Sequence, residues 1–413
     1  MKRQKQGLWL LLLIHIVIGT SYAILTPLWQ GHEADYYNVI RFLVTEQRFP
    51  TPADYPNGDA DIRQATQPPL YFLIAAPIVA LFDDAQPVPY GLHPLPLCIG
   101  GEGDNSTPYI TSKAYNSPFQ GSVGAAYALR LLNVLLTAAA VYFTYKTGRN
   151  LFANQPTTAL IGAAILAFEP VTLQSVIVIS NDALLLAACS AILFLCARLL
   201  MREQVSRGDI ITVIALGISA PLIKLPGWAA LLLSLAALTY PLISQPKNRR
   251  ILLFGVGLIA LLTVVIGLFN YQNYGSVLGR YSVLDSFALS LIQQFDVPWV
   301  IIRGVIEQTA SDFSSALALV HARAAFFTLY NLLLVLCFIA ALSGLIAALF
   351  KPNAKKLRVV ALLIGLTLMT LIMVIFRNTL TANADNTTTY NTAMIFAPVR
   401  SVSYTHLTLP TNR

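Results

Sequence analysis

Two carboxylates that can do acid–base or metal chemistry lie two residues apart, directly after the first apolar segment of the chain, as Glu33 and Asp35. Carboxylates act as general bases and are preferred ligands of hard divalent cations. Glu33 and Asp35 are therefore the predicted catalytic residues and the candidate ligands of a divalent cation. The alternative is a pair of solvated acids in the first turn of an amphipathic helix, where the helix dipole stabilises them.

A lone cation, Lys224, lies between two apolar runs and is flanked by Pro221 and Pro226. An ionisable group at such a depth is a functional candidate in a membrane protein, and a phosphate is its natural partner. The alternative is that the ammonium group reaches the membrane surface along its own alkyl chain. Arg280 and Arg303, in a later polar segment, are further candidates for the same role.

Two other polar positions accompany the ends of apolar runs. Asp182 follows Asn181 at the start of a run, where a carboxylate commonly caps a helix, although a place beside an outer cleft also suits a substrate contact. Tyr71 follows Gln67-Pro68-Pro69-Leu70, and the prolines favour the start of a helix there. Aromatic residues at such a helix start are typical of an interfacial anchor.

The elements that must position these residues are membrane-spanning helices. The 413 residues are 56% hydrophobic and 11% charged, with a mean hydropathy of +0.64. Soluble domains carry about 25% charged residues, so a water-soluble globule is excluded. The basic residues form short clusters between apolar runs, as in cytoplasmic loops. This pattern, without a basic stripe, argues against nucleic-acid binding.

Nine apolar runs predict an all-α, polytopic bundle of about nine spans. They are residues 8–28, 124–145, 158–179, 183–200, 210–223, 227–243, 251–270, 326–350 and 359–376. With the N-terminus in the cytoplasm, alternation of the spans places the basic clusters inside and most acids outside. The chemistry is therefore expected on the extracytoplasmic side of the cell membrane.

Two large external segments are expected, at residues 29–123 and 271–323. The first is predicted to hold two helices at the membrane surface: Glu33–Gln47, with an apolar stripe opposite polar residues, and Leu70–Phe82, which is too short to span the membrane. We interpret residues 1–399 as one transmembrane domain. Residues 401–413 (SVSYTHLTLPTNR) resemble translated sequencing-adaptor read-through, so residues 400–413 are expected to be a non-native tail.

In their order along residues 8–295, these motifs resemble the glycosyltransferase C superfamily, specifically the bacterial relatives of the protein O-mannosyltransferases and of the lipid A aminoarabinose transferase. The matching features are the acidic motif after the first span, the Gln67–Tyr71 segment, an Arg-Leu start to the second span at Arg130, the Asn181-Asp182 pair and Lys224. Many relatives have Asp-Glu where this chain has His32-Glu33, so Asp35 is the acid that can compensate.

The resemblance implies a glycosyltransferase that moves a hexosyl or pentosyl group from a polyprenyl-phosphate carrier to a protein, lipid or polysaccharide acceptor. The substrate-binding residues that it implies are His32, Gln67, Tyr71, Asn181, Asp182, Lys224, Arg280 and Arg303. Apart from a divalent cation at Glu33 and Asp35, the sequence indicates no cofactor.

Two other classes of function remain open at the level of sequence. A transporter or lipid flippase with an acidic outer vestibule would need ionisable groups deep in its spans, and Glu169, beside Pro170 in the third span, is the feature that favours it. A non-enzymatic membrane scaffold would show no dependence on Glu33.

Overall fold

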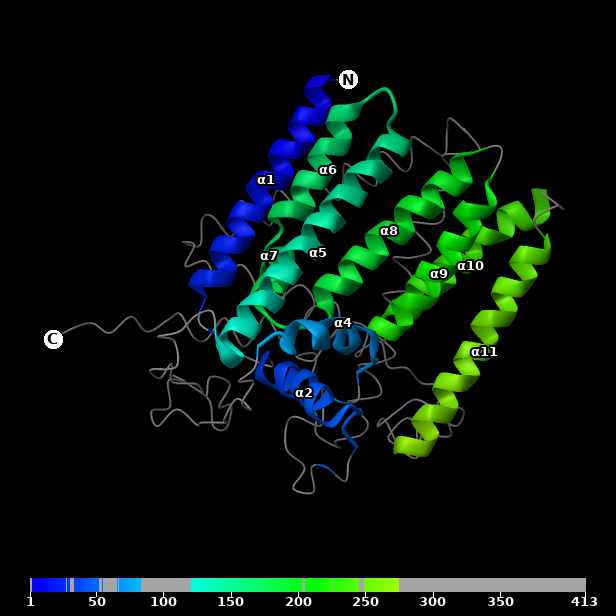
Figure 1. Ribbon diagram of the computed structural model, residues 1–413. Coiled ribbons are helices and arrows are strands. Elements are labelled where there is room, and N and C mark those ends of the chain that lie inside the picture. The colour runs from blue at the N-terminus through cyan, green and yellow to red at the C-terminus, as the bar shows by residue number, and fades with distance from the viewer. Residues whose placement is uncertain are drawn as a thin grey trace, which may run out of the picture.

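Helices make up most of the part of the chain that the computed structural model describes. That part comprises residues 2–26, 28–29, 33–51, 54, 65, 67–82, 120–202, 205–224, 226–244 and 249–274. Its helices are α1 (Lys2–Leu25), α2 (Glu33–Glu46), α4 (Leu70–Val79), α5 (Gly121–Leu151), α6 (Pro156–Phe168), α7 (Pro170–Ile177), α8 (Asp182–Met201), α9 (Arg207–Ile223), α10 (Gly227–Ser244) and α11 (Arg249–Tyr274). No strand occurs in these residues, and the predicted all-α class is confirmed (Figure 1).

Three helices of the described part are long and apolar enough to cross a membrane: Gln6–Leu25, Gly121–Leu151 and Asp182–Met201. The first seven predicted spans all fall on helices, but the count of nine is not confirmed. The runs 326–350 and 359–376 lie outside the described residues, as does nearly all of the second external segment.

The distribution of polarity in the bundle is that of a membrane protein. Large apolar side chains face outward, such as Trp9 at 65% and Leu25 at 81% exposure, whereas His15 and Arg130 are fully buried. An apolar exterior is unfavourable in water but suits hydrocarbon, where polar groups must find partners inside the protein. The predicted membrane location is therefore supported by the packing as well as by the composition.

The third predicted span is two helices, because the chain leaves the helical conformation at Glu169, where ψ is 129°. Pro170 cannot continue a helix from the preceding turn, since it lacks an N–H group, but it is suited to the first position of a new helix. The Glu169 carboxylate caps α7 by accepting hydrogen bonds from the Thr172 backbone N–H (2.8 Å) and the Thr172 hydroxyl (3.0 Å). Helix capping thus accounts for the acid that had favoured a transporter.

A buried histidine compensates for this break. The Ala167 carbonyl is near the end of α6, where helical carbonyls lack intrahelical partners, and it lies 2.9 Å from His15 Nδ1. Because a carbonyl only accepts, Nδ1 carries a proton in this contact. The other ring nitrogen lies 2.9 Å from the Thr137 hydroxyl on α5. His15 therefore links α1, α5 and α6 at mid-bundle.

Helices α2 and α4 lie across one end of the bundle formed by the longer helices (Figure 1). Helix α4 packs against α2, α5 and α9. Both helices occur where the sequence predicted them, but the amphipathic pattern predicted for α2 is wrong at its start. All eight residues from Glu33 to Ile40 are buried, because α4 and the start of α5 enclose the first half of α2 in one apolar cluster.

Close packing of α5 on α6 depends on small residues. The buried side chains of α6 are Ala159, Ala163 and Ala167, one turn apart, and such small residues let two membrane helices approach closely. Gly148 of α5 is the tightest point, since an added Cβ would lie 2.9 Å from both Cα and Cβ of Ala159.

We predict that Gly148→Ala lowers the free energy of unfolding by about 1–3 kcal/mol, because the new methyl group must displace the Ala159 backbone. Gly162→Ala is the matched control, since a Cβ there meets nothing within 4 Å and alanine favours the helix. Thermal unfolding of both variants in detergent measures the difference. Equal melting temperatures would show that α5 and α6 do not approach as closely as the structure has them.

Candidate functional site

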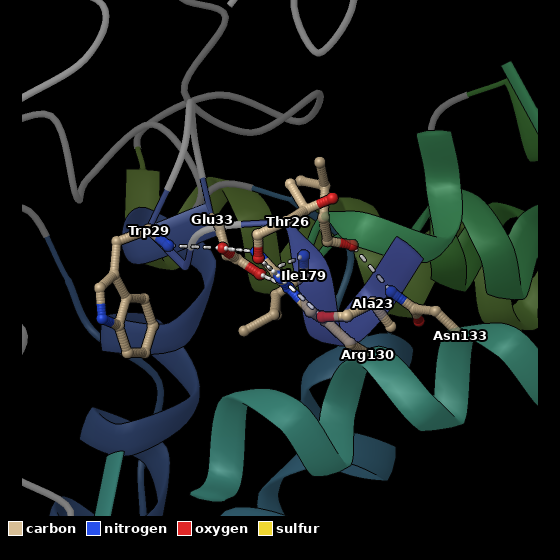
Figure 2. Close-up of polar contacts among 8 residues, drawn as sticks. Ala23, Thr26, Trp29, Glu33, Arg130, Asn133 and Ile179 are labelled. Carbon is tan, nitrogen blue, oxygen red and sulfur yellow. Dashed lines mark hydrogen bonds and ion pairs between the residues drawn. The ribbon is translucent and has the colours of Figure 1, made fainter. Parts of the chain in front are cut away.

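Polar side chains gather at the α2–α4 end of the bundle, and we call them the polar cluster: Glu33, Tyr36, Tyr71, Arg130, Asn133, Asn181, Asp182 and Lys224. Its centre is an ion pair between Glu33 and Arg130, which are both fully buried. Arg130 Nε donates to Glu33 Oε1 and one terminal nitrogen donates to Oε2, each at 2.7 Å. This two-point geometry is the strongest that arginine makes with a carboxylate. Figure 2 shows the pair enclosed between the end of α1 and the start of α5.

Backbone groups from three further segments complete this pair. Glu33 also accepts hydrogen bonds from the backbone N–H groups of Trp29 (2.7 Å) and Ile179 (3.3 Å). Arg130 donates in addition to the carbonyls of Ala23 (2.9 Å) and Thr26 (2.7 Å). Trp29 has a φ of 66°, a conformation that costs free energy in a bulky residue. Its N–H bond to Glu33 holds that conformation in place (Figure 2).

The surroundings of Glu33 determine what its carboxylate can do. Its two oxygens accept four hydrogen bonds, two of them from a cation. Both oxygens are thus already engaged with donors inside the protein. To take a proton from a substrate, Glu33 would have to break part of this network, so the geometry suits a structural anchor better than a general base.

The predicted pairing of Glu33 with Asp35 on one cation is not favoured by helix geometry. Both acids lie in the first turn of α2, and residues two positions apart on a helix do not face each other. Asp35 is buried, with 6% of its surface exposed. Within the described ranges, no group of three or more histidine, cysteine, aspartate or glutamate residues is arranged to hold a metal ion, and His32 lies outside those ranges.

A second ion pair joins Asp182 at the start of α8 to Lys224 at the end of α9, with Nζ 2.5 Å from Oδ1. Both side chains are partly exposed, at 33% for Asp182 and 21% for Lys224. The Ser180 hydroxyl lies 3.1 Å from the other Asp182 oxygen. Asp182 is thus not the cap of its helix, since the N-cap position belongs to Asn181, and Lys224 binds an acid rather than merely extending to the membrane surface.

A tight turn between α9 and α10 fixes the position of Lys224. The Gly227 N–H donates to the Lys224 carbonyl at 2.8 Å. The Gly227 backbone also passes so close to the Ala220 carbonyl that a Cβ would overlap it. Only glycine fits here, and Lys224 is therefore held at the end of α9.

Asn181 connects the two ion pairs through the helices that carry them. Its amide nitrogen donates to the Ile223 carbonyl at the end of α9 (2.8 Å), and its oxygen accepts from the Tyr36 hydroxyl on α2 (3.1 Å). One fully buried amide therefore fixes the starts of α2 and α8 and the end of α9 relative to each other.

Tyr71 of α4 is fully buried between the two ion pairs. Its ring contacts Tyr36 and Phe72 edge-on, with centroids 6.1 Å apart in both cases. Burial, followed by the negative charges of Glu33 and Asp182, raises the pKa of Tyr71 well above its usual value, and Asn133 opposes this shift. The hydroxyl therefore stays protonated.

Two buried polar atoms near Tyr71 lack partners. Among the described residues, neither the Tyr71 hydroxyl nor the Asn133 carbonyl oxygen has a partner that satisfies hydrogen-bond geometry. The Asn133 amide nitrogen is occupied by the Val178 carbonyl at 2.8 Å (Figure 2). Asn133 nevertheless acts on the Tyr71 hydroxyl as a hydrogen-bonding neighbour, so a small rotation of either side chain would satisfy both atoms, as is normal for buried polar groups.

The structure therefore brings most of the predicted residues together. Those that lie in or beside this cluster are Glu33, Asp35, Tyr71, Asn181, Asp182 and Lys224. Gln67 is half-buried just before α4, whereas His32, Arg280 and Arg303 lie outside the described residues.

Sequence reasoning missed the polar residues of the cluster that come from elsewhere, above all Arg130 and Asn133. The sequence shows Arg130 in a family motif inside an apolar run but does not indicate its partner. A fully charged residue inside an apolar run was nevertheless a usable signal, because membrane proteins bury such a group only with a partner.

Comparison with known proteins supports the resemblance over part of the chain. Residues 122–268 match the family model described as dolichyl-phosphate-mannose-protein mannosyltransferase. No curated protein and no solved structure matches the chain. The matched region contains Arg130, Asn133, Asn181, Asp182 and Lys224, so both ion pairs have at least one member inside it. Over this region the chain is similar to a family of membrane glycosyltransferases, as the order of its motifs predicted.

Proposed function

We propose that the protein is a membrane glycosyltransferase that moves a sugar from a polyprenyl-phosphate donor to an acceptor on the extracytoplasmic side of the cell membrane. The observation that carries this proposal is the partly exposed Asp182–Lys224 pair. It lies at the edge of a buried polar cluster, within the region that matches a mannosyltransferase family. A cation and an acid in contact with each other are the two groups that such a transfer needs.

In this reaction the acceptor hydroxyl oxygen forms a bond to the anomeric carbon of the sugar. The bond between that carbon and the phosphate oxygen breaks, and its electron pair leaves with the phosphate. Lys224 is suited to neutralise the charge that grows on the departing phosphate. As its ammonium group turns towards the phosphate, the Asp182 carboxylate is released to take the acceptor proton or to bind a sugar hydroxyl.

In this proposal Glu33 is a positioning residue. Its ion pair with Arg130 joins α2 to α5, and its bond to the Ile179 N–H holds the connection that leads to Asp182. Asp35 and the residues outside the described ranges keep their predicted roles as further contacts. A divalent cation is not needed for the roles assigned to Lys224 and Asp182.

The side of the membrane on which the reaction takes place is inferred from the charge pattern of the sequence. The Asp182–Lys224 pair lies at the opposite end of α8 from Arg198 and Arg202. Basic ends of membrane helices favour the cytoplasm, which supports an outer location for the pair. There a lipid-linked donor can keep its chain in the membrane while its phosphate reaches Lys224.

The transporter alternative has lost its supporting feature, because Glu169 caps α7. His15 remains as an ionisable group at mid-bundle, but it lies in a contact that compensates for a helix break. A scaffold without activity gives no reason for a partly exposed ion pair at the edge of a buried polar cluster.

We predict that Lys224→Gln lowers transfer of labelled sugar from polyprenyl-phosphate donors by about 100-fold or more, a loss typical of removing one electrostatic contact to a transition state. Asp182→Asn is expected to lose activity as well. Arg48→Gln is the matched control, because Arg48 pairs with Asp54 on the protein surface. Full activity of folded Lys224→Gln and Asp182→Asn membranes would remove this pair from the mechanism.

A second prediction separates positioning by Glu33 from direct chemistry. Glu33→Gln leaves Arg130 as an uncompensated buried charge, which costs about 3–5 kcal/mol of stability, so both the melting temperature and transfer activity are expected to fall. The double variant Glu33→Gln/Arg130→Gln removes both charges and is expected to recover most of the melting temperature and part of the activity. A double variant that is stable but inactive would instead identify Glu33 as a catalytic residue.

A further inference from the structure

A cavity of about 640 Å³ lies at the opposite end of the bundle from the candidate site, where the start of α1 meets the ends of α5 and α8. It is unrelated to the Asp182–Lys224 pair. Lys146, which lines the cavity, lies sixteen positions after Arg130 on α5, a rise of about 24 Å along the helix. Its volume falls in the range of pockets that hold small ligands, roughly 300–1,000 Å³.

Four basic side chains line this cavity, and an anion bound there would offset the repulsion between their positive charges. They are Lys146 and Arg149 of α5, and Arg198 and Arg202 at the end of α8. Among the described residues, Asp209 is the acid that pairs with them, at 3.3 Å from Arg198 and 3.0 Å from Arg202. Arg198 and Arg202 share this acid, whereas Lys146 and Arg149 have no described carboxylate partner.

The two basic residues of α5 are not held by acids. The Lys146 ammonium lies 5.7 Å from the centre of the Tyr142 ring. One Arg149 nitrogen donates to the Ala153 carbonyl at 3.3 Å, a long contact. Both side chains are half-buried, where repulsion between like charges is screened less than in bulk water.

Two buried donors on the cavity wall are also unsatisfied. In the described part of the chain, neither Arg198 Nε nor the Asn150 amide nitrogen has a hydrogen-bond partner. Each is a donor rather than an acceptor. The missing partner is therefore rich in acceptor oxygens, as a phosphate group is.

The remaining wall of the cavity is apolar and reaches the exterior of the bundle. Leu8 and Trp9 of α1 and Phe194 of α8 line it together with Tyr142. Trp9 is 65% exposed, so the cavity adjoins the surface that faces hydrocarbon. A ligand with a phosphate and an attached acyl chain fits both parts of the wall.

We infer that this cavity binds the phosphate headgroup of an anionic membrane phospholipid, with its acyl chains along the Trp9 face of α1. Basic pockets between membrane helices on the cytoplasmic side bind such headgroups. The end of the bundle that carries these basic residues is also the end that the charge pattern predicts to be cytoplasmic. This inference does not depend on the proposed transfer reaction.

The test is binding of phosphatidylglycerol to the full chain in neutral detergent, followed through the rise in melting temperature. We expect phosphatidylglycerol to raise the melting temperature, and phosphatidylcholine and inorganic phosphate not to do so. In Lys146→Gln/Arg149→Gln the apparent affinity for phosphatidylglycerol is expected to fall by about tenfold or more, since each basic residue near an anionic lipid contributes about one kcal/mol.

Two matched variants separate a specific site from general attraction. Arg207→Gln removes a charge from the same end of the bundle outside the cavity, and Lys146→Arg/Arg149→Lys keeps the cavity charge; both are expected to bind as the unaltered chain does. Equal loss of affinity in Arg207→Gln, or no loss in Lys146→Gln/Arg149→Gln, would overturn the proposal. An equal response to inorganic phosphate would also overturn it, by showing that the cavity takes a soluble anion.

Should Lys146→Gln/Arg149→Gln fail to fold, Arg149→Gln alone carries the test, with at least a threefold loss of affinity expected. A single variant that binds phosphatidylglycerol as tightly as the unaltered chain would then count against the site.

Discussion

The buried contact between Glu33 and Arg130 is the constraint on which the α2–α4 end of the molecule depends. Both side chains are inaccessible to solvent, and a charge in that position is tolerated only when it is paired and its other hydrogen-bonding groups are satisfied. The partners that satisfy this pair come from α1, from the Trp29 segment and from Ile179. Three parts of the chain that are distant in sequence, at residues 23–33, at Arg130 and at Ile179, are therefore held in one arrangement by a single electrostatic requirement.

That arrangement explains why the accessible charged groups lie beside the buried ion pair rather than within it. A carboxylate that accepts four hydrogen bonds is committed to its partners, whereas Asp182 and Lys224 share one contact and remain partly exposed. A fixed inner pair and a more open outer pair together form a site with rigid walls and one exchangeable contact. In the proposed reaction the inner pair keeps its geometry, and the Asp182–Lys224 contact is the one that opens.

The charged residues are arranged differently at the two ends of the helix bundle. At the α2–α4 end, each of the two described ion pairs joins one acid to one base. At the other end, four basic residues line one cavity, and the described acid Asp209 pairs with two of them. The first arrangement suits a reaction in which charge moves, and the second suits a ligand that brings its own negative charge and stays bound.

The sequence by itself determined the class of the protein and the helices, because a run of about twenty apolar residues has a stable structure in hydrocarbon as a helix, whatever surrounds it. It also placed α2 and α4, and identified Glu33, Asp182 and Lys224 as residues of interest. Only the tertiary structure decided their partners. Arg130 lies 97 positions after Glu33 and Lys224 lies 42 after Asp182, and no local pattern encodes such pairings. Whether a carboxylate is an anchor or a reactive group depends on which donors reach it, and those donors are brought to it by the packing of helices.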